Sequence, residues 1–132
     1  MITTKKVTSW LLRILAAVIM LQTLYYKFSG AEESVFIFST LGIEPWGRIL
    51  TGCMELIAAA LLIIPSTIIP GALLTIGIMA GAIASHLLKL GIVVQNDGGL
   101  LFVYACTAML SALLLLLLHN QDLIKLKQQF KF

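Results

Sequence analysis

Charged residues are scarce in this chain of 132 residues. Only 11% of the residues are charged, while 60% are hydrophobic. Soluble domains are roughly 25% charged and 45–50% apolar. The scarcity of charge and the presence of several long apolar runs exclude an ordinary soluble domain. They indicate a single transmembrane domain over residues 1–132, with the lipid bilayer as its surroundings.

Cysteine is also scarce, and neither cysteine belongs to a recognisable motif. Cys53 and Cys106 lie inside apolar segments, with no CxxC or other metal-ligand spacing. We interpret both as buried free thiols, with a disulfide as the alternative. The sequence predicts no metal site. Its basic residues are distributed over both sides of the apolar segments, so no nucleic-acid partner is expected.

Four apolar segments are long enough to cross a bilayer, which requires about 20 residues in a helix. They cover residues 9–27, 46–65, 68–91 and 100–118. The first is too long for the apolar part of a signal peptide and lacks a clear cleavage site. The last three are joined by short turns. The sequence therefore predicts an all-α polytopic membrane protein, an antiparallel four-transmembrane-helix bundle.

The one sizeable connection, Ser29 to Trp46, predicts a short interfacial helix between spans 1 and 2. Ser29 is an N-cap candidate, Glu32 and Glu33 fall in the first turn, and Gly42 is a suitable end. The apolar residues of this helix are suited to the membrane interface or to covering the mouth of the bundle.

The distribution of basic residues predicts the orientation. Lysine and arginine near the termini outnumber those near the long connection and the third turn: Lys5, Lys6, Arg13, Lys125, Lys127 and Lys131 against Lys27, Arg48 and Lys89. The positive-inside rule then places both termini in the cytoplasm. For the basic tail, residues 119–132, two interpretations stay open: a segment lying on an anionic membrane surface, or disorder.

A carboxylate lies near the middle of the second apolar span. Placing Glu55 at that depth costs roughly 2.5–3.5 kcal/mol on insertion scales, so Glu55 is by default a functional-site hypothesis. On a helix, Arg48, Thr51 and Glu55 share one face. Gly52 and Ala59 flank this face and allow a neighbouring helix to approach closely.

The candidate ligand-binding residues lie in the external halves of their helices: Glu55, His86, Arg48, Lys27, Lys89 and Tyr104. The opposite halves, such as LLIIP and LLLLLLH, are almost pure hydrocarbon. This layout predicts a polar pocket open to the outside, with Glu55 roughly 10 Å below the end of its helix. In the alternative interpretation, Glu55 pairs with a neighbouring cation and only sets the helix register, and His86 is a satisfied core residue.

A stripe of small residues on the third span has two interpretations. Gly77, Gly81 and Ala84 share a face that differs from the face of His86. Such a stripe serves either as packing inside one chain or as the seam of a homo-oligomer. We expect packing inside the chain.

Three segments of the chain resemble the DoxX family of small four-helix membrane proteins. They are RILAAVIMLQTLYYKF, which Arg13 and Lys27 bracket, LGIEPWGRILTGCMELIAAALLIIP with its central Glu55, and MAGAIASHLLKLG with its His86. The match covers about Leu12 to Leu118. The resemblance implies a four-helix fold in a bacterial cytoplasmic membrane, with Arg13, Lys27, Glu55 and His86 at the matching positions.

The resemblance also implies a redox- or quinone-associated membrane subunit. On this hypothesis a quinone is the cofactor, Glu55 and His86 exchange protons, Arg48 or Lys89 tunes them, and a redox partner protein supplies electrons. The alternative is a non-enzymatic membrane assembly or interaction protein with a structural ion-pair cluster. A transporter is less favoured, because the chain lacks inverted repeats and broken helices. Whether the protein is an enzyme stays open.

Overall fold

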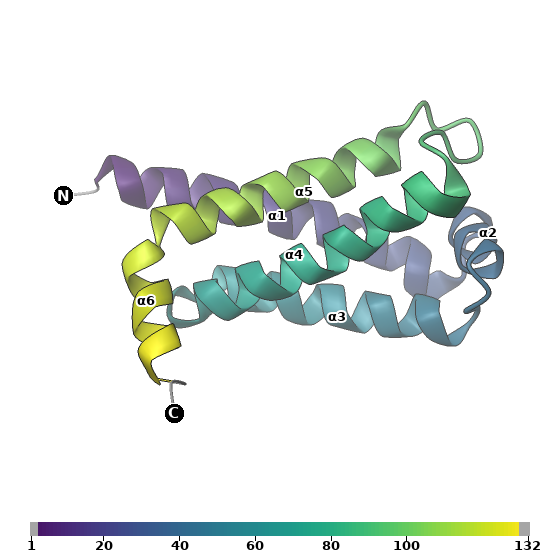
Figure 1. Cartoon of the computed structure of the whole chain (residues 1–132). Helices are drawn as coiled ribbons and strands as arrows, with labels where there is room; N and C mark the ends of the chain where they lie inside the picture. Colours follow the sequence, from purple (N-terminus) through teal and green to yellow (C-terminus); the bar gives the residue numbers. More distant parts are fainter. Residues whose placement is uncertain (1–2, 130–132) are drawn as a thin grey trace.

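Four long helices form an antiparallel bundle in the computed structural model, which describes residues 3–129 (Figure 1). They are α1 (Thr4–Ser29), α3 (Trp46–Ile63), α4 (Ile68–Ser85) and α5 (Leu100–Leu118). Around the bundle, α1 packs on α3, α3 on α4, α4 on α5, and α5 on α1. Each of the four is long and apolar enough to cross a membrane, α4 together with the segments that flank it. The predicted all-α four-helix bundle is confirmed.

The helix boundaries differ from prediction at the first span. α1 begins at Thr4 rather than near residue 9, because the Thr3 hydroxyl caps it by accepting a hydrogen bond from the Lys6 N–H at 3.2 Å. α1 also includes Ser29 and ends at Gly30, whose φ of 69° is the left-handed conformation that favours glycine. Ser29 is therefore the last residue of α1 and not the cap of the next helix.

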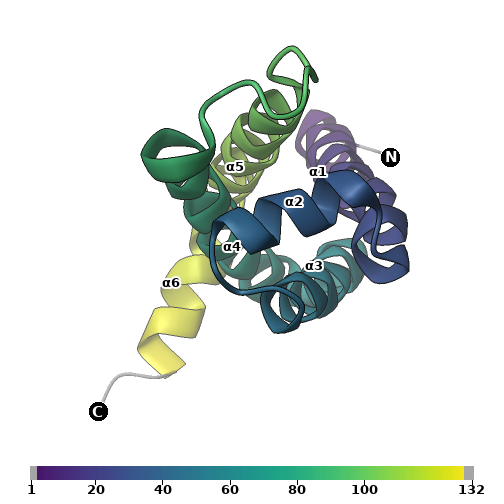
Figure 2. The ribbon, with the colours of Figure 1, turned by 90° about the vertical axis from the view of Figure 1, so that its right-hand side faces the viewer.

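The connection after α1 forms α2 (Glu32–Thr40), which lies across one end of the bundle (Figure 2). Its first turn contains Glu32 and Glu33, as predicted, while Ala31 takes the N-cap position. α2 is seated on the bundle by Ser34 and Phe38, which are both buried. It covers the bundle mouth, which is one of the two positions expected for this helix.

The third span ends in a change of helix type. α4 follows the short 3₁₀ turn η1 (Pro65–Thr67) and continues without a break into the π-helical turn η2 (His86–Leu90). π-helical turns are rare and frequently occur at functional sites. The loop that follows is organised by Asp97, whose carboxylate accepts hydrogen bonds from the N–H groups of Val94, Gly99 and Leu101 at 3.0, 2.8 and 3.2 Å.

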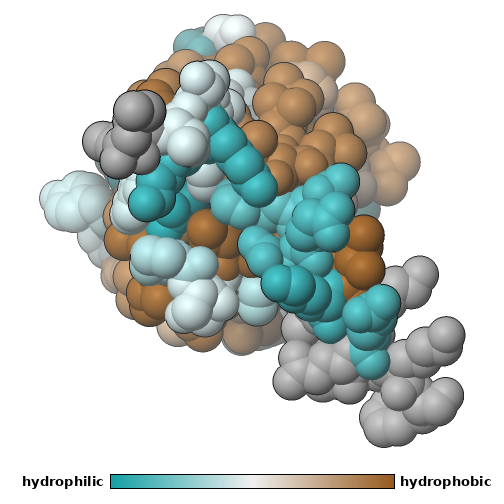
Figure 3. Space-filling model, turned by 90° about the vertical axis from the view of Figure 1, so that its left-hand side faces the viewer, coloured by the Kyte–Doolittle hydropathy of each residue, from teal (hydrophilic) through white to brown (hydrophobic). Residues whose placement is uncertain are grey.

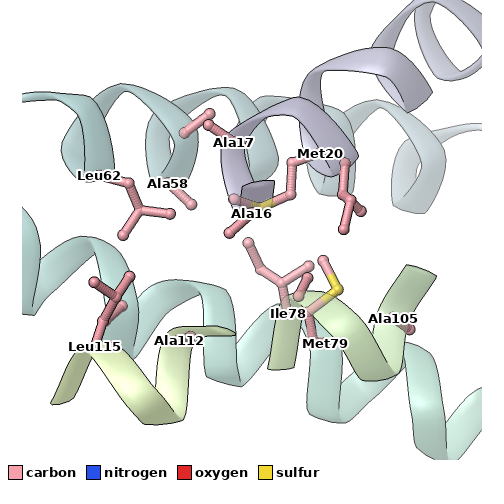
Figure 4. Packing of buried hydrophobic residues seen from close by; sticks show 14 of the residues in the cluster. Ala16, Ala17, Met20, Ala58, Leu62, Ile78, Met79, Ala105, Ala112 and Leu115 are labelled. Carbon is pink, nitrogen blue, oxygen red and sulfur yellow. The ribbon is translucent and has the colours of Figure 1, made fainter. Parts of the chain in front are cut away.

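Small residues bring the helices close together in the core. Alanines such as Ala16, Ala58 and Ala112 are completely buried at the helix contacts (Figure 4). Gly71 of α4 lies so close to α3 that a Cβ atom there would be 2.9 Å from the Leu62 backbone nitrogen. Membrane helices associate by such close packing, because lipid provides no hydrophobic force between them.

The predicted close approach along the Glu55 face of α3 is confirmed. A Cβ atom on Gly52 would lie 2.9 Å from the Phe28 ring of α1, and Ala59 is 1% exposed. The glutamate face of α3 therefore packs directly on α1, which sets the distance at which their polar groups meet.

The predicted packing of the Gly77 and Gly81 stripe inside the chain is wrong. No atom lies within 4 Å of a Cβ built on Gly77 or on Gly81, so this stripe does not pack inside the described part of the chain. The reason is that α4 turns its Gly71 and Thr75 face, not this one, toward its neighbours. The homo-oligomer seam stays a prediction. Both cysteines are free thiols, but Cys53 is exposed and Cys106 half-buried, so the prediction that both are buried is wrong.

The C-terminal tail is helical over α6 (Asn120–Gln129). α6 turns away from α5 and lies crosswise to the bundle, at the end opposite α2 (Figure 1). Disorder, one of the two interpretations of the tail, does not hold for this helical segment, and its position on a membrane surface stays a prediction. Residues 130–132 of the predicted tail, with Lys131, lie outside the described residues.

Candidate functional site

The carboxylate inside the second span is buried and paired. Glu55 lies in the middle of α3 and is 3% exposed. Its Oε1 atom is 2.7 Å from the Lys27 Nζ atom, which comes from the last turns of α1. The antiparallel arrangement puts the end of α1 beside the start of α3, and a helical side chain leans toward the N-terminal end of its own helix, which brings the long Lys27 side chain to Glu55. Lys27 is therefore the candidate cation that pairs with Glu55.

A threonine completes this site. Thr23 precedes Lys27 by one turn of α1, and its Oγ1 atom accepts a hydrogen bond from Lys27 Nζ at 3.2 Å. Thr23 Oγ1 also lies 3.3 Å from Glu55 Oε2 and 2.8 Å from the Met20 carbonyl oxygen. Its one proton must serve both acceptors. The sequence prediction omitted Thr23, although the i, i+4 spacing to Lys27 was a usable signal.

The Glu55 carboxylate is incompletely satisfied by hydrogen bonds. Within the described part of the chain, no donor reaches Oε1 with regular hydrogen-bond geometry, so its 2.7 Å contact with Lys27 is an ion pair. The Lys27 side chain is 15% exposed and the Glu55 side chain 4% exposed. Solvent or a ligand therefore approaches the pair from the side of Lys27, the more exposed partner. We refer to Thr23, Lys27 and Glu55 as the ion-pair site.

Arg48 does not reach Glu55. Its Nε atom lies 2.9 and 3.1 Å from the two carboxylate oxygens of Glu44, one turn earlier. The guanidinium group also donates to the Lys27 carbonyl oxygen. The last carbonyls of a helix have no partner within it, and a cation stabilises that end. Arg48 therefore joins the start of α3 to the end of α1.

Arg13 makes the corresponding contact at the other end of the same helix pair. It is 2% exposed and donates from Nε to the Leu62 carbonyl oxygen and from a terminal nitrogen to the Ile63 carbonyl oxygen, the latter at 2.6 Å. Its guanidinium carbon lies 3.7 Å from the centre of the Trp10 ring. Each of α1 and α3 thus carries an arginine that caps the C-terminal end of the other.

The other predicted site residues lie on the α4–α5 side of the bundle. His86 is buried in η2, with Nδ1 2.9 Å from the Gly91 carbonyl oxygen and its ring edge-to-face with Phe102. Lys89 is exposed and forms no ion pair with a described residue. Tyr104 is half-buried against the core. No hydrogen bond or ion pair between described residues links these three to Glu55.

The polar pocket at the ion-pair site stays a prediction. Two hollows on the described surface lie elsewhere, one between α1 and α5 and one between α6 and the turn from α3 to α4. Residues 3–129 contain no group of three or more His, Cys, Asp and Glu side chains placed to hold a metal ion.

The comparison with protein families identifies the chain. A model of the DoxX-like family matches residues 11–119, which include most of α1 and all of α3, α4 and α5. The chain belongs to the DoxX-like family. No curated protein and no solved structure matches it. Family membership and the four apolar helices make this DoxX-like chain an integral membrane protein.

Proposed function

We propose that this DoxX-like protein is a redox-associated membrane subunit whose ion-pair site binds a quinone headgroup and handles its protons. The observation that carries the proposal is the Lys27–Glu55 pair itself. Burying both charges inside a membrane span is costly, and intramembrane ionisable residues mostly mark ligand or proton pathways. Packing alone does not require a carboxylate at this depth.

The donors of the ion-pair site suit a quinone carbonyl. The Lys27 ammonium group has three N–H donors, and one is donated to Thr23, while the group pairs with Glu55 as an ion pair. A remaining donor can bind a carbonyl oxygen that approaches from the exposed side of Lys27. The proposed polar pocket would then open in the external half of the bundle, beneath α2. A bound quinone would supply the redox chemistry, with electrons from a redox partner protein.

Glu55 is placed to hold or release a proton. Its charge depends on Lys27, because the described residues offer Oε1 no other cation or regular donor. If the ammonium group turns toward a ligand, the buried carboxylate loses its counter-ion, which is costly. Ligand binding and the charge of Glu55 are coupled in this way through one lysine side chain.

The test compares bound quinone in three proteins purified from their membranes: wild type, Glu55→Gln and the control Glu44→Gln. Glu44 is likewise paired with a cation, Arg48, but it is only half-buried and lies outside the ion-pair site. Mass spectrometry should find quinone with wild type and Glu44→Gln, and much less with a folded Glu55→Gln protein. Equal quinone content in all three proteins refutes the proposal.

A second function, a non-enzymatic assembly protein, is favoured by one observation. In α1 and α3, the deeply placed cations are compensated within the chain, by Glu55, by Glu44 or by helix-end carbonyls. Such a cluster can set helix register without a ligand. If wild type and Glu55→Gln copurify with the same protein partners and neither contains quinone, this second function replaces the first.

We also propose that the protein lies in a bacterial cytoplasmic membrane with both termini in the cytoplasm. The excess of lysine near the termini supports this orientation. Ser39 of α2 and Gln121 of α6 are both exposed and lie at opposite ends of the bundle. In a variant without Cys53 and Cys106, an impermeant thiol reagent outside the cell should label Ser39→Cys and not Gln121→Cys. The reverse pattern rejects the orientation.

A further inference from the structure

The end of the bundle that carries both termini has an unusual element, the crosswise helix α6. Its start is tied to α1 by a hydrogen bond of 2.8 Å between Ser9 Oγ and His119 Nε2. His119 Nδ1 lies 3.5 Å from Asp122 Oδ2 within the first turn of α6. These are the residue types of a hydrolase triad, but Ser9 is 3% exposed and its hydroxyl is not open to a substrate. The contact therefore anchors α6 across this end.

Positive charge and apolar surface occur together on this end. Lys5 and Lys6 in the first turn of α1 and Lys125 in α6 are all exposed. Ile124 beside Lys125 is 47% exposed, so an aliphatic side chain lies next to the positive charge on α6. Figure 3 views this end and shows hydrophilic residues spread over it, with apolar surface beside them.

The opposite end has the opposite charge balance. It carries four acidic residues against three basic ones: Glu32, Glu33, Glu44 and Asp97 against Lys27, Arg48 and Lys89. At the end with α6, Asp122 is the one acidic residue beside several lysines. A basic end with a crosswise helix complements an anionic surface, and the acidic end does not. The end with α6 therefore favours an anionic surface, and the end with α2 does not.

A hollow beside α6 offers room for a headgroup. It has a volume of about 300 Å³ and lies between α6 and the turn from α3 to α4. Lys125 and Asp122 line one side, and Ser66 lies among the prolines and isoleucines of the other. The lysine, the serine and the apolar residues suit a phosphate group and the beginning of acyl chains, whereas the Asp122 carboxylate opposes an anion, so the phosphate is expected on the Lys125 side.

We propose that α6 and the first turn of α1 form a binding surface for anionic phospholipid headgroups, with Lys5, Lys6 and Lys125 as the phosphate-binding residues. Exposed Ile124 would enter the boundary between headgroups and acyl chains. Each lysine near an anionic surface contributes about fivefold in affinity. This surface is far from the ion-pair site, so the inference does not depend on the quinone proposal.

The experiment measures lipid binding to the full chain by native mass spectrometry in detergent, with phosphatidylglycerol and phosphatidylcholine as probes. Wild type should prefer phosphatidylglycerol. Lys125→Gln should lower this preference about fivefold, and Lys5→Gln/Lys6→Gln/Lys125→Gln on the order of 100-fold if the effects are additive. The matched control is Lys89→Gln, an exposed lysine at the other end, which should keep the preference of wild type.

A second measurement tests whether the preference is electrostatic. In wild type, the preference for phosphatidylglycerol should fall as the salt concentration rises, because exposed charges are screened. Each of three outcomes would overturn the inference. The triple variant could keep the full preference, Lys89→Gln could lose as much preference as Lys125→Gln, or the wild-type preference could be insensitive to salt. An acidic protein partner as the true occupant would appear as a wild type without preference for phosphatidylglycerol, which also overturns the inference.

Discussion

The Lys27–Glu55 pair allows a test in which the effect of one substitution changes sign. Lys27→Met leaves the buried Glu55 carboxylate without its counter-ion. Removing one partner of a buried ion pair costs about 3–5 kcal/mol, and Glu55 is 3% exposed, so we expect a loss in that range. Glu55→Gln should cost less, because the Lys27 side chain is 15% exposed and can turn toward a more polar environment.

The double variant Lys27→Met/Glu55→Gln removes both charges. It should be more stable than Lys27→Met alone, because neutral groups of similar shape replace an unpaired buried charge. Glu55→Gln thus destabilises the wild-type background and stabilises the Lys27→Met background. The free energy of unfolding of all four proteins can be measured by SDS titration in mixed micelles, with helix content followed by circular dichroism.

The same four proteins show what would refute the reasoning. If Glu55→Gln has the same effect on stability in both backgrounds, Lys27 and Glu55 do not interact, and the pair is not the basis of the site. If the double variant regains stability but contains no quinone, the charges serve ligand binding rather than folding. This second result supports the proposed function.

Three further predictions concern other parts of the bundle. Arg13→Met should lower the free energy of unfolding by at least about 1.5–3 kcal/mol, because the guanidinium hydrogen bonds to two α3 carbonyls are lost; chemical unfolding measures this, and a loss within error would contradict the capping role. Burial and the charge of Lys5 lower the pKa of His119, so protonation favours release of α6. The protection of α6 amides against hydrogen exchange, corrected for the intrinsic pH dependence of exchange, should therefore be high above the ordinary histidine pKa of about 6.5 and fall as the pH drops below it, and His119→Gln should abolish this change in protection. Gly71→Val should disrupt the contact between α3 and α4, whereas Gly77→Val should be tolerated in the monomer, because no atom lies within 4 Å of its Cβ position; equal thermal stability of the two variants would contradict this packing.

The architecture was predictable because each span is defined by its own hydrophobicity. Length and the short turns were sufficient for the number of spans and their antiparallel order. The ends of helices were less predictable, since capping depends on single residues. Serine is a residue type that N-cap positions favour, yet Gly30 after Ser29 provides the left-handed turn that ends α1. The helical state of residues 120–129 was likewise open, because a short basic segment is compatible with both order and disorder.

The site was only partly predictable from helical phase. A shared face correctly placed Glu55 toward its neighbours, but it did not choose between Lys27 and Arg48. The choice depends on the stagger of α1 against α3, which brings Arg48 to Glu44 and to the end of α1 instead. His86 shared the same membrane half as Glu55, yet its ring nitrogen bonds the loop that follows η2. The depth of a residue in the membrane can be estimated from the sequence. The neighbouring helix that its side chain faces is known only once the packing of the helices is known.

The reciprocal arginine caps of α1 and α3 have a consequence for how the protein is made. Arg13, Lys27, Arg48 and Glu55 all find their partners within the first 63 residues. The first two spans can therefore enter the bilayer together as a hairpin whose charges are already neutralised, before α4 has been synthesised. The later spans are almost purely apolar at their centres and can insert on their own hydrophobicity. The order of residues along the gene thus matches the order in which the membrane can accept them.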